Sequence, residues 1–245
     1  MKEENMRRGL LAIMLIILLS GGIGVIAFSN NYALYYACTQ EQDTALVIMN
    51  SGGSDTYYTI KVYDAYGTLL EAVSDDIVAY ESNYQPLSDL VTIGSSTWGL
   101  VLINTPGLLT IGVETFINDQ WHSSDNILDP VPDDPGYTYY WYGLNYSNTA
   151  DQTTGIAILN PSSSPAAATI FIYDCFGSPQ EQIDVVLDPH ETDYYDSADI
   201  LGMADSMWGV VDIKATVPLI AAAEYFNADY LLLNVDQISH YYYAE

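Results

Sequence analysis

The chain has 245 residues and carries 32 acidic against five basic side chains, for a formal net charge of −27 at pH 7. So negative a chain is repelled by nucleic acid and by anionic lipid surfaces, and we exclude both as ligands. The length suits one or two domains, each large enough to bury a core.

An uncharged run at residues 9–28 predicts a membrane anchor. As a helix, its twenty residues at about 1.5 Å each span roughly 30 Å, the thickness of a bilayer's hydrocarbon core. Lys2, Arg7 and Arg8 precede the run, whereas only Lys61 and Lys214 follow it. This asymmetry predicts a cytoplasmic N-terminus and places the rest in the periplasm or outside the cell. We expect residues 1–29 to be a cytoplasmic stub and a retained single-pass signal anchor.

Two alternatives stay open for this segment. A secretory signal would be cleaved at Ala27-Phe28-Ser29, the only candidate exit site. A pilin-type leader would be cleaved after Gly9, so that a filament subunit begins at Leu10. Bacterial pilins resemble one another in having Glu where this chain has Met14.

Beyond residue 29, short runs of alternating side chains separated by turn residues predict strands. Thr44–Asn50 is apolar and β-branched, and Tyr57–Tyr63 alternates between two faces. Asp64-Ala65-Tyr66-Gly67 suits a tight hairpin, because Asp accepts bonds from backbone N–H groups and Gly adopts positive φ.

Weaker strands follow near residues 69–73 and 77–84, and Pro86–Val91 is long enough for about one helical turn. Trp98–Asn104 alternates again, with Val101 and Ile103 facing the core, and Leu109–Phe116 is a last strong strand. With a first strand at Tyr32–Tyr36, this makes about seven strands, the number typical of an immunoglobulin-like β-sandwich.

The second half of the chain repeats the first. Residues 32–135 recur as residues 142–245 at an offset of 110 without a gap, so that Tyr63 matches Tyr173 and Trp98 matches Trp208. Positions shared by both copies are those that the fold demands. We therefore expect an all-β chain with two tandem immunoglobulin-like β-sandwich domains, at residues 30–122 and 137–245, after one transmembrane helix. An acidic, proline-rich linker at residues 123–136 would join them.

Three motifs recur in this pattern: Asn160-Pro161-Ser162 before a strand, Tyr173–Gly177 at its end, and Trp208-Gly209 in a later strand. The pattern resembles the tandem immunoglobulin-like β-sandwich repeats of prokaryotic secreted or surface-anchored proteins. The resemblance implies a fold and a location, and it transfers no functional residue.

Motifs that carry chemistry are absent from the sequence. His122, His190 and His240 have no partner histidine at ligand spacing, and no nucleophile elbow, phosphate loop or dinucleotide fingerprint is present. We expect no enzyme and no cofactor. The one inorganic hypothesis is a structural calcium ion at Asp125, Asp129, Asp133 and Asp134, for which solvated surface carboxylates are the simpler interpretation.

Two further features concern the fold. Glu114 and Glu224 are matched acids in otherwise apolar strands, and we expect a tyrosine hydroxyl, a backbone N–H or water to bind each. Cys38 and Cys175 occupy non-equivalent positions, so neither copy has a disulfide of its own, and a bridge between the copies stays open.

Tyrosine is in excess, with 22 residues in the chain. Its rings suit interfaces where one end is apolar and the other wet. We expect two clusters to contact a partner protein: Tyr139, Tyr140, Trp141 and Tyr142, and Tyr241, Tyr242 and Tyr243.

The leading functional hypothesis is a non-catalytic, membrane-anchored, extracytoplasmic protein-interaction or scaffolding subunit of a membrane or cell-surface assembly. Its partners would be other membrane or surface proteins, with the bilayer contacted through residues 9–28. The alternatives are a carbohydrate-binding or adhesive module, with Trp98, Trp141 and Trp208 as stacking platforms, and a pilin-like filament subunit.

Overall fold

The computed structural model describes residues 30–39, 41–91, 97–127, 139–201, 206–229, 231–238 and 242–244. The predicted anchor at residues 1–29 lies outside these ranges. Within them, no helix has the length and hydropathy needed to cross a membrane.

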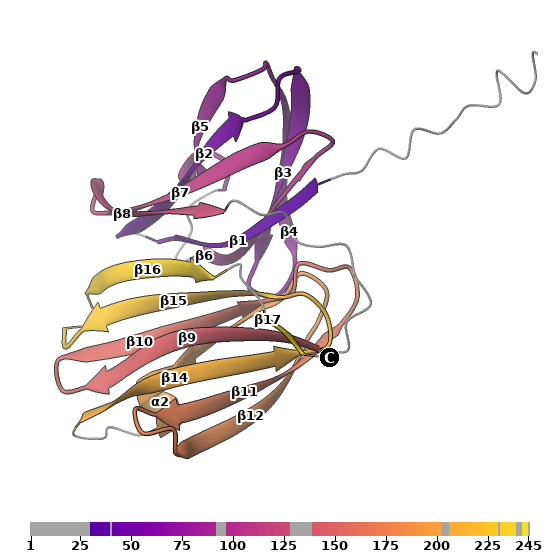
Figure 1. The fold of residues 1–245 in the computed structure, drawn as a ribbon. Helices are drawn as coiled ribbons and strands as arrows, with labels where there is room; N and C mark the ends of the chain where they lie inside the picture. The colour runs from indigo at the N-terminus through magenta and orange to yellow at the C-terminus, as the bar shows by residue number, and fades with distance from the viewer. Residues whose placement is uncertain are drawn as a thin grey trace, which may run out of the picture.

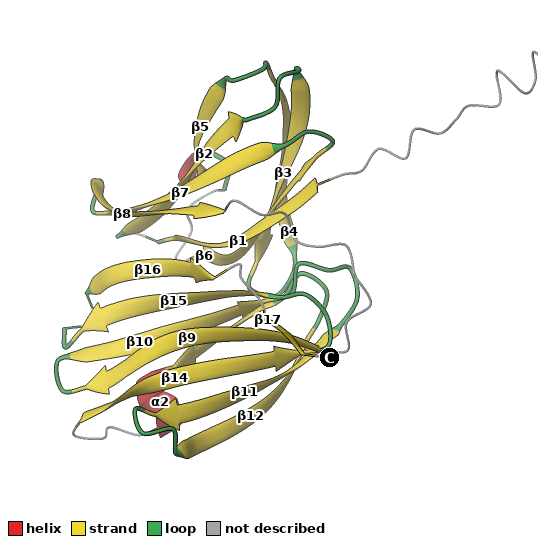
Figure 2. Ribbon diagram, in the orientation of Figure 1, coloured by secondary structure: helices red, strands yellow, loops and turns green. Residues whose placement is uncertain are grey.

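The described chain is all-β and contains several antiparallel sheets (Figures 1 and 2). We call residues 30–127 the first repeat and residues 139–244 the second repeat. Figure 1 shows the first repeat stacked on the second, with β1 and β6 next to β15 and β16.

The first repeat has two four-stranded sheets, ordered β1-β6-β3-β4 and β5-β2-β7-β8. Its elements are β1 (Asn30–Cys38), β2 (Gln42–Asn50), β3 (Thr56–Asp64), β4 (Leu69–Ile77), β5 (Ser82–Pro86), the 3-10 turn η1 (Leu87–Asp89), β6 (Thr97–Thr105), β7 (Leu109–Ile117) and β8 (Gln120–Ile127).

The second repeat has the corresponding eight strands, β9–β16, and an additional strand, β17. Its two layers are linked into one sheet through a single residue pair between β9 and β10, Thr149 and Gln152. Its elements are β9 (Tyr139–Thr149), β10 (Gln152–Leu159), β11 (Ala166–Asp174), β12 (Pro179–Leu187), β13 (Thr192–Asp196), α2 (Ser197–Leu201), β14 (Ser206–Ala215), β15 (Ile220–Asn227), β16 (Leu232–Ile238) and β17 (Tyr242–Ala244).

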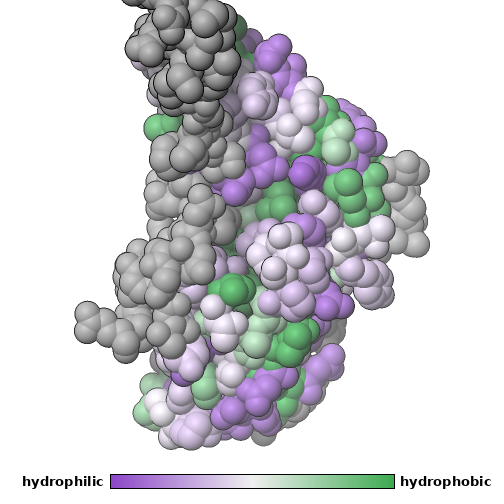
Figure 3. All heavy atoms as spheres, turned by 90° about the vertical axis from the view of Figure 1, so that its right-hand side faces the viewer, coloured by the Kyte–Doolittle hydropathy of each residue, from purple (hydrophilic) through white to green (hydrophobic). Residues whose placement is uncertain are grey.

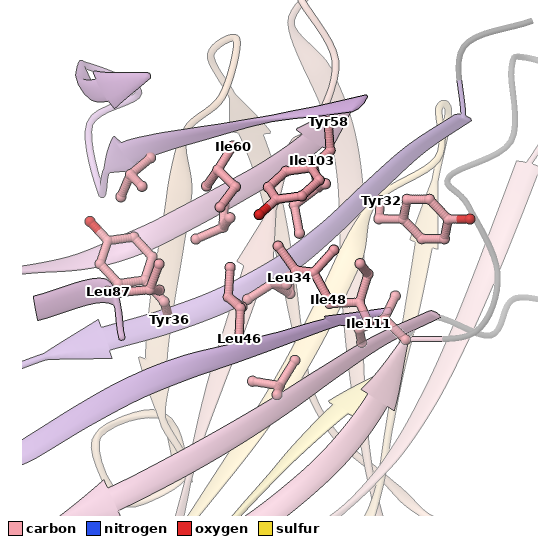
Figure 4. Packing of buried hydrophobic residues seen from close by; sticks show 14 of the residues in the cluster. Tyr32, Leu34, Tyr36, Leu46, Ile48, Tyr58, Ile60, Leu87, Ile103 and Ile111 are labelled. Atoms are coloured by element: carbon pink, nitrogen blue, oxygen red, sulfur yellow. The ribbon is translucent and has the colours of Figure 1, made fainter. Parts of the chain in front are cut away.

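The two sheets of the first repeat enclose one apolar core, to which alternate residues of each strand contribute. Figure 4 shows Leu34 and Tyr36 of β1 among the aliphatic side chains of this core. The Tyr32 hydroxyl donates to the carbonyl oxygen of Leu109 at 2.9 Å, which ties β1 to the start of β7. Val101 and Ile103 face this core, as predicted.

Aspartate and glycine form the two hairpin turns as predicted. The Oδ1 of Asp64 accepts from the backbone N–H groups of Tyr66 and Thr68, and Gly67 has φ 77°. In the second repeat, Asp174 and Gly177 (φ 79°) form the same turn. The helical turn predicted at Pro86–Val91 is present as η1, and α2 occupies the corresponding place in the second repeat.

The predicted linker begins too early. β8 reaches Ile127 and pairs along β7, so residues 123–127 belong to the first repeat, which has eight strands where we expected seven. The sequence of β8 is mostly polar because only its C-terminal end meets the core, at the buried Ile127. Residues 128–138 lie outside the described ranges.

The constant offset of 110 also ends at this strand. Glu114 pairs with Ser124, whereas the matching Glu224 pairs with Val235, so the turn before β16 is one residue longer than the turn before β8. An exposed hairpin tip tolerates such an insertion, because the strands on either side keep their pairing.

Candidate interaction surfaces

The two repeats meet through an apolar cluster between the outer faces of two sheets, which we call the joint. β1, β3 and β6 contribute Ala33, Tyr35, Ala37, Tyr63, Leu100 and Leu102. β10, β15 and β16 contribute Ala157, Leu159, Ile220, Ala222, Leu232 and Val235. Every one of these side chains is at most 9% exposed, so their removal from water favours one fixed arrangement of the repeats.

A buried carboxylate lies in the joint. Glu224 of β15 is 4% exposed, and its Oε1 accepts from the Nε2 of Gln42 at 3.3 Å. The side chains of Tyr35 and Tyr194 also hydrogen-bond to this carboxylate. The predicted tyrosine partner of this acid is confirmed, and it comes from both repeats.

Burial governs the titration of this group. Desolvation raises the pKa of Glu224, and the hydrogen bonds from Gln42, Tyr194 and Tyr35 oppose that shift. Burial, followed by the nearby charge of Glu224, also raises the pKa of Tyr35 and of Tyr194. Both tyrosines therefore remain protonated at neutral pH and able to donate.

Gln237 of β16 fastens the same edge of β1. Its Oε1 accepts from the backbone N–H of Tyr35 and its Nε2 donates to the carbonyl oxygen of Tyr35, both at 2.9 Å. The backbone N–H of Gln237 donates in turn to Asp125 Oδ2 at 2.7 Å. A side-chain amide thus satisfies a strand backbone that has no neighbouring strand at that point.

The hairpin turn after β3 docks on the second repeat. The carbonyl oxygen of Ala65 accepts from the backbone N–H of Thr192 at 3.0 Å, and the rings of Tyr63 and His190 lie 4.3 Å apart. Burial, and then the charge of Lys61, lower the pKa of His190, so this ring is neutral at neutral pH.

The second repeat also has an open aromatic face, formed by the outward side chains of β9, β11 and β14. The rings of Trp141 and Phe171 stack at 6.2 Å, and those of Phe171 and Tyr173 at 6.5 Å. Trp208 extends the face and is 60% exposed. Lys214 Nζ lies 3.7 Å from the centre of the Tyr139 ring, a cation–π contact. This arrangement offers apolar area with one positive charge at Lys214 and one carboxylate, Asp212, opposite Phe171.

Away from the open aromatic face, one side of the described chain carries exposed hydrophobic side chains that are scattered and do not form one patch. Figure 3 shows the side of the molecule that lies at the right in Figure 1, where small hydrophobic groups alternate with hydrophilic residues. Scattered exposed apolar residues of this kind are ordinary on a protein surface.

The predicted tyrosine cluster divides between two environments. Tyr139 and Trp141 lie on the open aromatic face, but Tyr140 and Tyr142 are 0% and 1% exposed and belong to the core. The prediction that these two contact a partner is wrong, because successive side chains of a strand point to opposite faces.

The second predicted cluster pairs with the first. Tyr242 and Tyr243 lie in β17, opposite Trp141 and Tyr140 of β9. Tyr241 lies outside the described residues. Sequence reasoning missed Phe171 and Tyr173. These residues alternate with the core residues Ile170 and Ile172 along one strand, and this alternation indicates that their rings face outward together.

The tryptophans divide in the same way. Trp141 and Trp208 share the open aromatic face, whereas Trp98 is partly buried in the joint, where its ring lies 5.8 Å from that of Tyr194. The ring of Trp98 is therefore less open to a ligand than that of Trp208, which is 60% exposed.

The structure does not bring the four predicted calcium ligands together within the described residues. Asp125 binds the backbone N–H of Gln237, and Asp129, Asp133 and Asp134 lie outside the described ranges. In the described part of the chain, no three His, Cys, Asp or Glu residues are placed to hold a metal ion. Cys38 is buried and Cys175 exposed, and neither forms a disulfide.

Comparisons with known proteins assign no family to the chain. No family model and no curated protein matches the chain. A β-glucuronidase from Bacteroides uniformis is 11% identical over 88% of this chain, with a TM-score of 0.21. The exported protein XepA of PBSX is 9% identical, over 82% of this chain and 88% of its own, with a TM-score of 0.22. The chain spans 26% of that glucuronidase, and at these TM-scores the likeness carries no argument about function.

Proposed function

We propose that this chain is a non-catalytic protein-interaction or scaffolding subunit of a membrane or cell-surface assembly. Residues 9–28 would anchor it in the bilayer, with both repeats on the periplasmic or extracellular side, and we take each repeat to be an immunoglobulin-like β-sandwich. The charge asymmetry around residues 9–28 supports the orientation. The facing antiparallel sheets around one core support the sandwich.

The open aromatic face carries this proposal. Trp141, Phe171, Tyr173 and Trp208 project from three adjacent strands of one sheet. Aromatic side chains supply much of the binding energy in protein interfaces, because they bury large areas with few rotatable bonds. The joint, which fixes the two repeats, would hold this face in a constant orientation to the membrane anchor.

The test is co-purification of the full chain from native membranes in mild detergent. Wild-type chain should carry companions in fixed stoichiometry, and Trp208→Arg should lose most of them, since a charge would replace the most exposed ring of the face. Leu231→Arg is the matched control, because Leu231 is 55% exposed at the hairpin tip between β15 and β16, away from the open aromatic face. A wild-type chain that purifies alone would contradict the proposal.

A carbohydrate-binding or adhesive module is the second candidate, and the parallel rings of Trp141 and Phe171, tilted by only 21°, favour it. Flat sugar faces stack on such rings. A glycan array would give hits that Trp141→Ala abolishes, with a change in tryptophan fluorescence on titration. A pilin-like subunit is the third, and it requires a mature N-terminus at Leu10, which N-terminal sequencing would establish.

A further inference from the structure

Each half of the joint occurs twice in the chain because of the repeat. We call the outer face of β1, β3 and β6, and its copy on β9, β11 and β14, the front faces. We call the outer face of β10, β13, β15 and β16, and its copy on β2, β5, β7 and β8, the back faces. The joint buries the front face of the first repeat against the back face of the second. Within the described residues, one front face and one back face are left uncovered.

The uncovered back face carries large side chains where the covered one does, although Ile220 and Val235 of the joint correspond to Thr110 and Ser124 there. Tyr84, Trp121 and Met49 are 54%, 59% and 37% exposed there. Tyr84 stands opposite Val47 as Tyr194 stands opposite Ala157. Trp121 stands opposite Phe116 as Leu232 stands opposite Phe226. Burial, and then the charge of Glu114, raise the pKa of Tyr84. Tyr84 and Glu114 thus repeat the pair Tyr194 and Glu224 without its cover.

The contacts of the joint can be transferred to the two uncovered faces one by one. Trp98 against Tyr194, 5.8 Å between rings, becomes Trp208 against Tyr84. The ring contact of Tyr63 with His190, at 4.3 Å, becomes Tyr173 with Tyr80. The equivalence extends to the backbone, since His190 and Tyr80 both have φ 64°.

The polar contact at the centre of the joint transfers as well. Gln42 donates to Glu224 at 3.3 Å, and the repeat places Gln152 and Glu114 in the same roles. Tyr35 has Asn145 as its counterpart, and an amide can donate to a carboxylate as a hydroxyl does.

From these matches we propose that a second copy of this chain docks head-to-tail, with the front face of β9, β11 and β14 of one chain on the back face of β2, β5 and β7 of the next. The inference rests on the proposed protein-interaction role of the open aromatic face, and names its partner. Such a contact is heterologous, so each added chain again offers one free front face and one free back face, and a row or a ring results.

Two features make this contact weaker than the joint. Leu102, buried in the joint, has Asp212 as its counterpart on the open front face. The net charge of −27 also makes two copies repel each other. Added salt screens that repulsion, so association should strengthen as ionic strength rises.

The experiment uses the full chain in mild detergent and measures its mass by sedimentation as a function of concentration. Trp208→Arg disables the front face and Tyr84→Arg the back face; both side chains are more than half exposed, so neither change disturbs the core. Each variant alone should stay monomeric. An equimolar mixture should form a dimer, because the intact front face of the Tyr84→Arg chain meets the intact back face of the Trp208→Arg chain.

The mixing step separates this geometry from its rivals. Val186→Arg is the control and should associate as wild type does, because its counterpart Asp76 is exposed in the first repeat, outside the joint. Association that persists in both single variants would show contact through another surface, and a mixture that stays monomeric would exclude a head-to-tail contact. A wild-type chain that stays monomeric at every concentration and salt would overturn the self-association alone. The role in protein interaction would then still be judged by the companions retained from native membranes.

Discussion

The side chain of Tyr35 in β1 hydrogen-bonds to the carboxylate of Glu224 in β15, so one contact joins the first strand of one repeat to the last strong strand of the other. Glu224 is 4% exposed, whereas the matching Glu114 is partly exposed because nothing in the described chain covers its face. The two acids occupy equivalent positions of β7 and β15, with Ala45 and Ser124 beside Glu114 and Gly155 and Val235 beside Glu224, and only Glu224 is covered by the other repeat. They therefore form a matched pair for measuring the contribution of the joint to stability.

Truncation of the buried acid should destabilise the protein much more than truncation of its copy. Glu224→Ala leaves Tyr35, Tyr194 and Gln42 without their acceptor, and we expect a loss of about 2–4 kcal/mol in the free energy of unfolding. Glu114→Ala should cost less than about 0.5 kcal/mol, as for a surface residue. Denaturant unfolding of the two variants provides the measurement. Equal losses would mean that the carboxylate of Glu224 adds nothing to the joint.

The raised pKa of Glu224 predicts a particular pH dependence. The folded state binds this proton more tightly than the unfolded chain, whose pKa is near the ordinary value of 4.5. Protonation of Glu224 therefore favours folding as the pH falls from neutral toward 4.5, and this contribution is lost as the pH rises through the folded pKa.

A comparison with Glu224→Gln isolates this group from the other carboxylates. The stability of wild type minus that of Glu224→Gln should increase as the pH is lowered from 7 to 4.5. The remaining acids are common to both proteins, so their repulsion cancels in the difference. A difference that shrinks on acidification would mean that the folded pKa lies below that of the unfolded chain.

Alternation along the strands made much of the fold predictable. Val101 and Ile103 were placed in the core from period-two patterning, and the Asp–Gly turns from the backbone demands of a hairpin. Sequence patterning does not reveal β8, because a strand that meets the core only at one end carries few apolar residues.

The joint was not predictable, because its residues are outward-facing members of ordinary strands. Nothing in the sequence around Tyr35 distinguishes a face that another repeat covers from one that stays open. Tyr140 and Tyr142 show the opposite error, since a cluster of rings in sequence is divided between two faces by the strand itself. Local periodicity fixes the face of a side chain, and only the packing of distant strands decides whether that face is exposed.

Two glycines in equivalent turns test whether the first hairpin depends on its docking. Gly67 has φ 77°, and a Cβ there would lie 2.5 Å from the carbonyl oxygen of Pro189. Gly177 has φ 79°, with nothing within 4 Å of the same position. Both substitutions to alanine incur the strain of a left-handed backbone, about 1 kcal/mol. Gly67→Ala must also displace the second repeat, so it should cost about 1–2 kcal/mol more than Gly177→Ala in thermal or chemical unfolding. Equal costs would show that the turn does not press on the second repeat.

The two cysteines should differ strongly in reactivity. Burial raises the pKa of the Cys38 thiol to about 12, and its Sγ donates to Asp43 Oδ1 at 3.2 Å, so almost none of it is thiolate at neutral pH. Cys175 is exposed in the turn between β11 and β12. Alkylation of the native chain at pH 8, followed by mass spectrometry, should modify Cys175 within minutes and leave Cys38 intact until the protein is unfolded.

The variant Cys175→Ser should then take up no reagent in the native state, whereas Cys38→Ser should react as wild type does. Rapid native labelling of Cys38 would mean that β1 opens readily, and this would contradict a tightly packed joint, because Tyr35 and Ala37 of the same strand are held there.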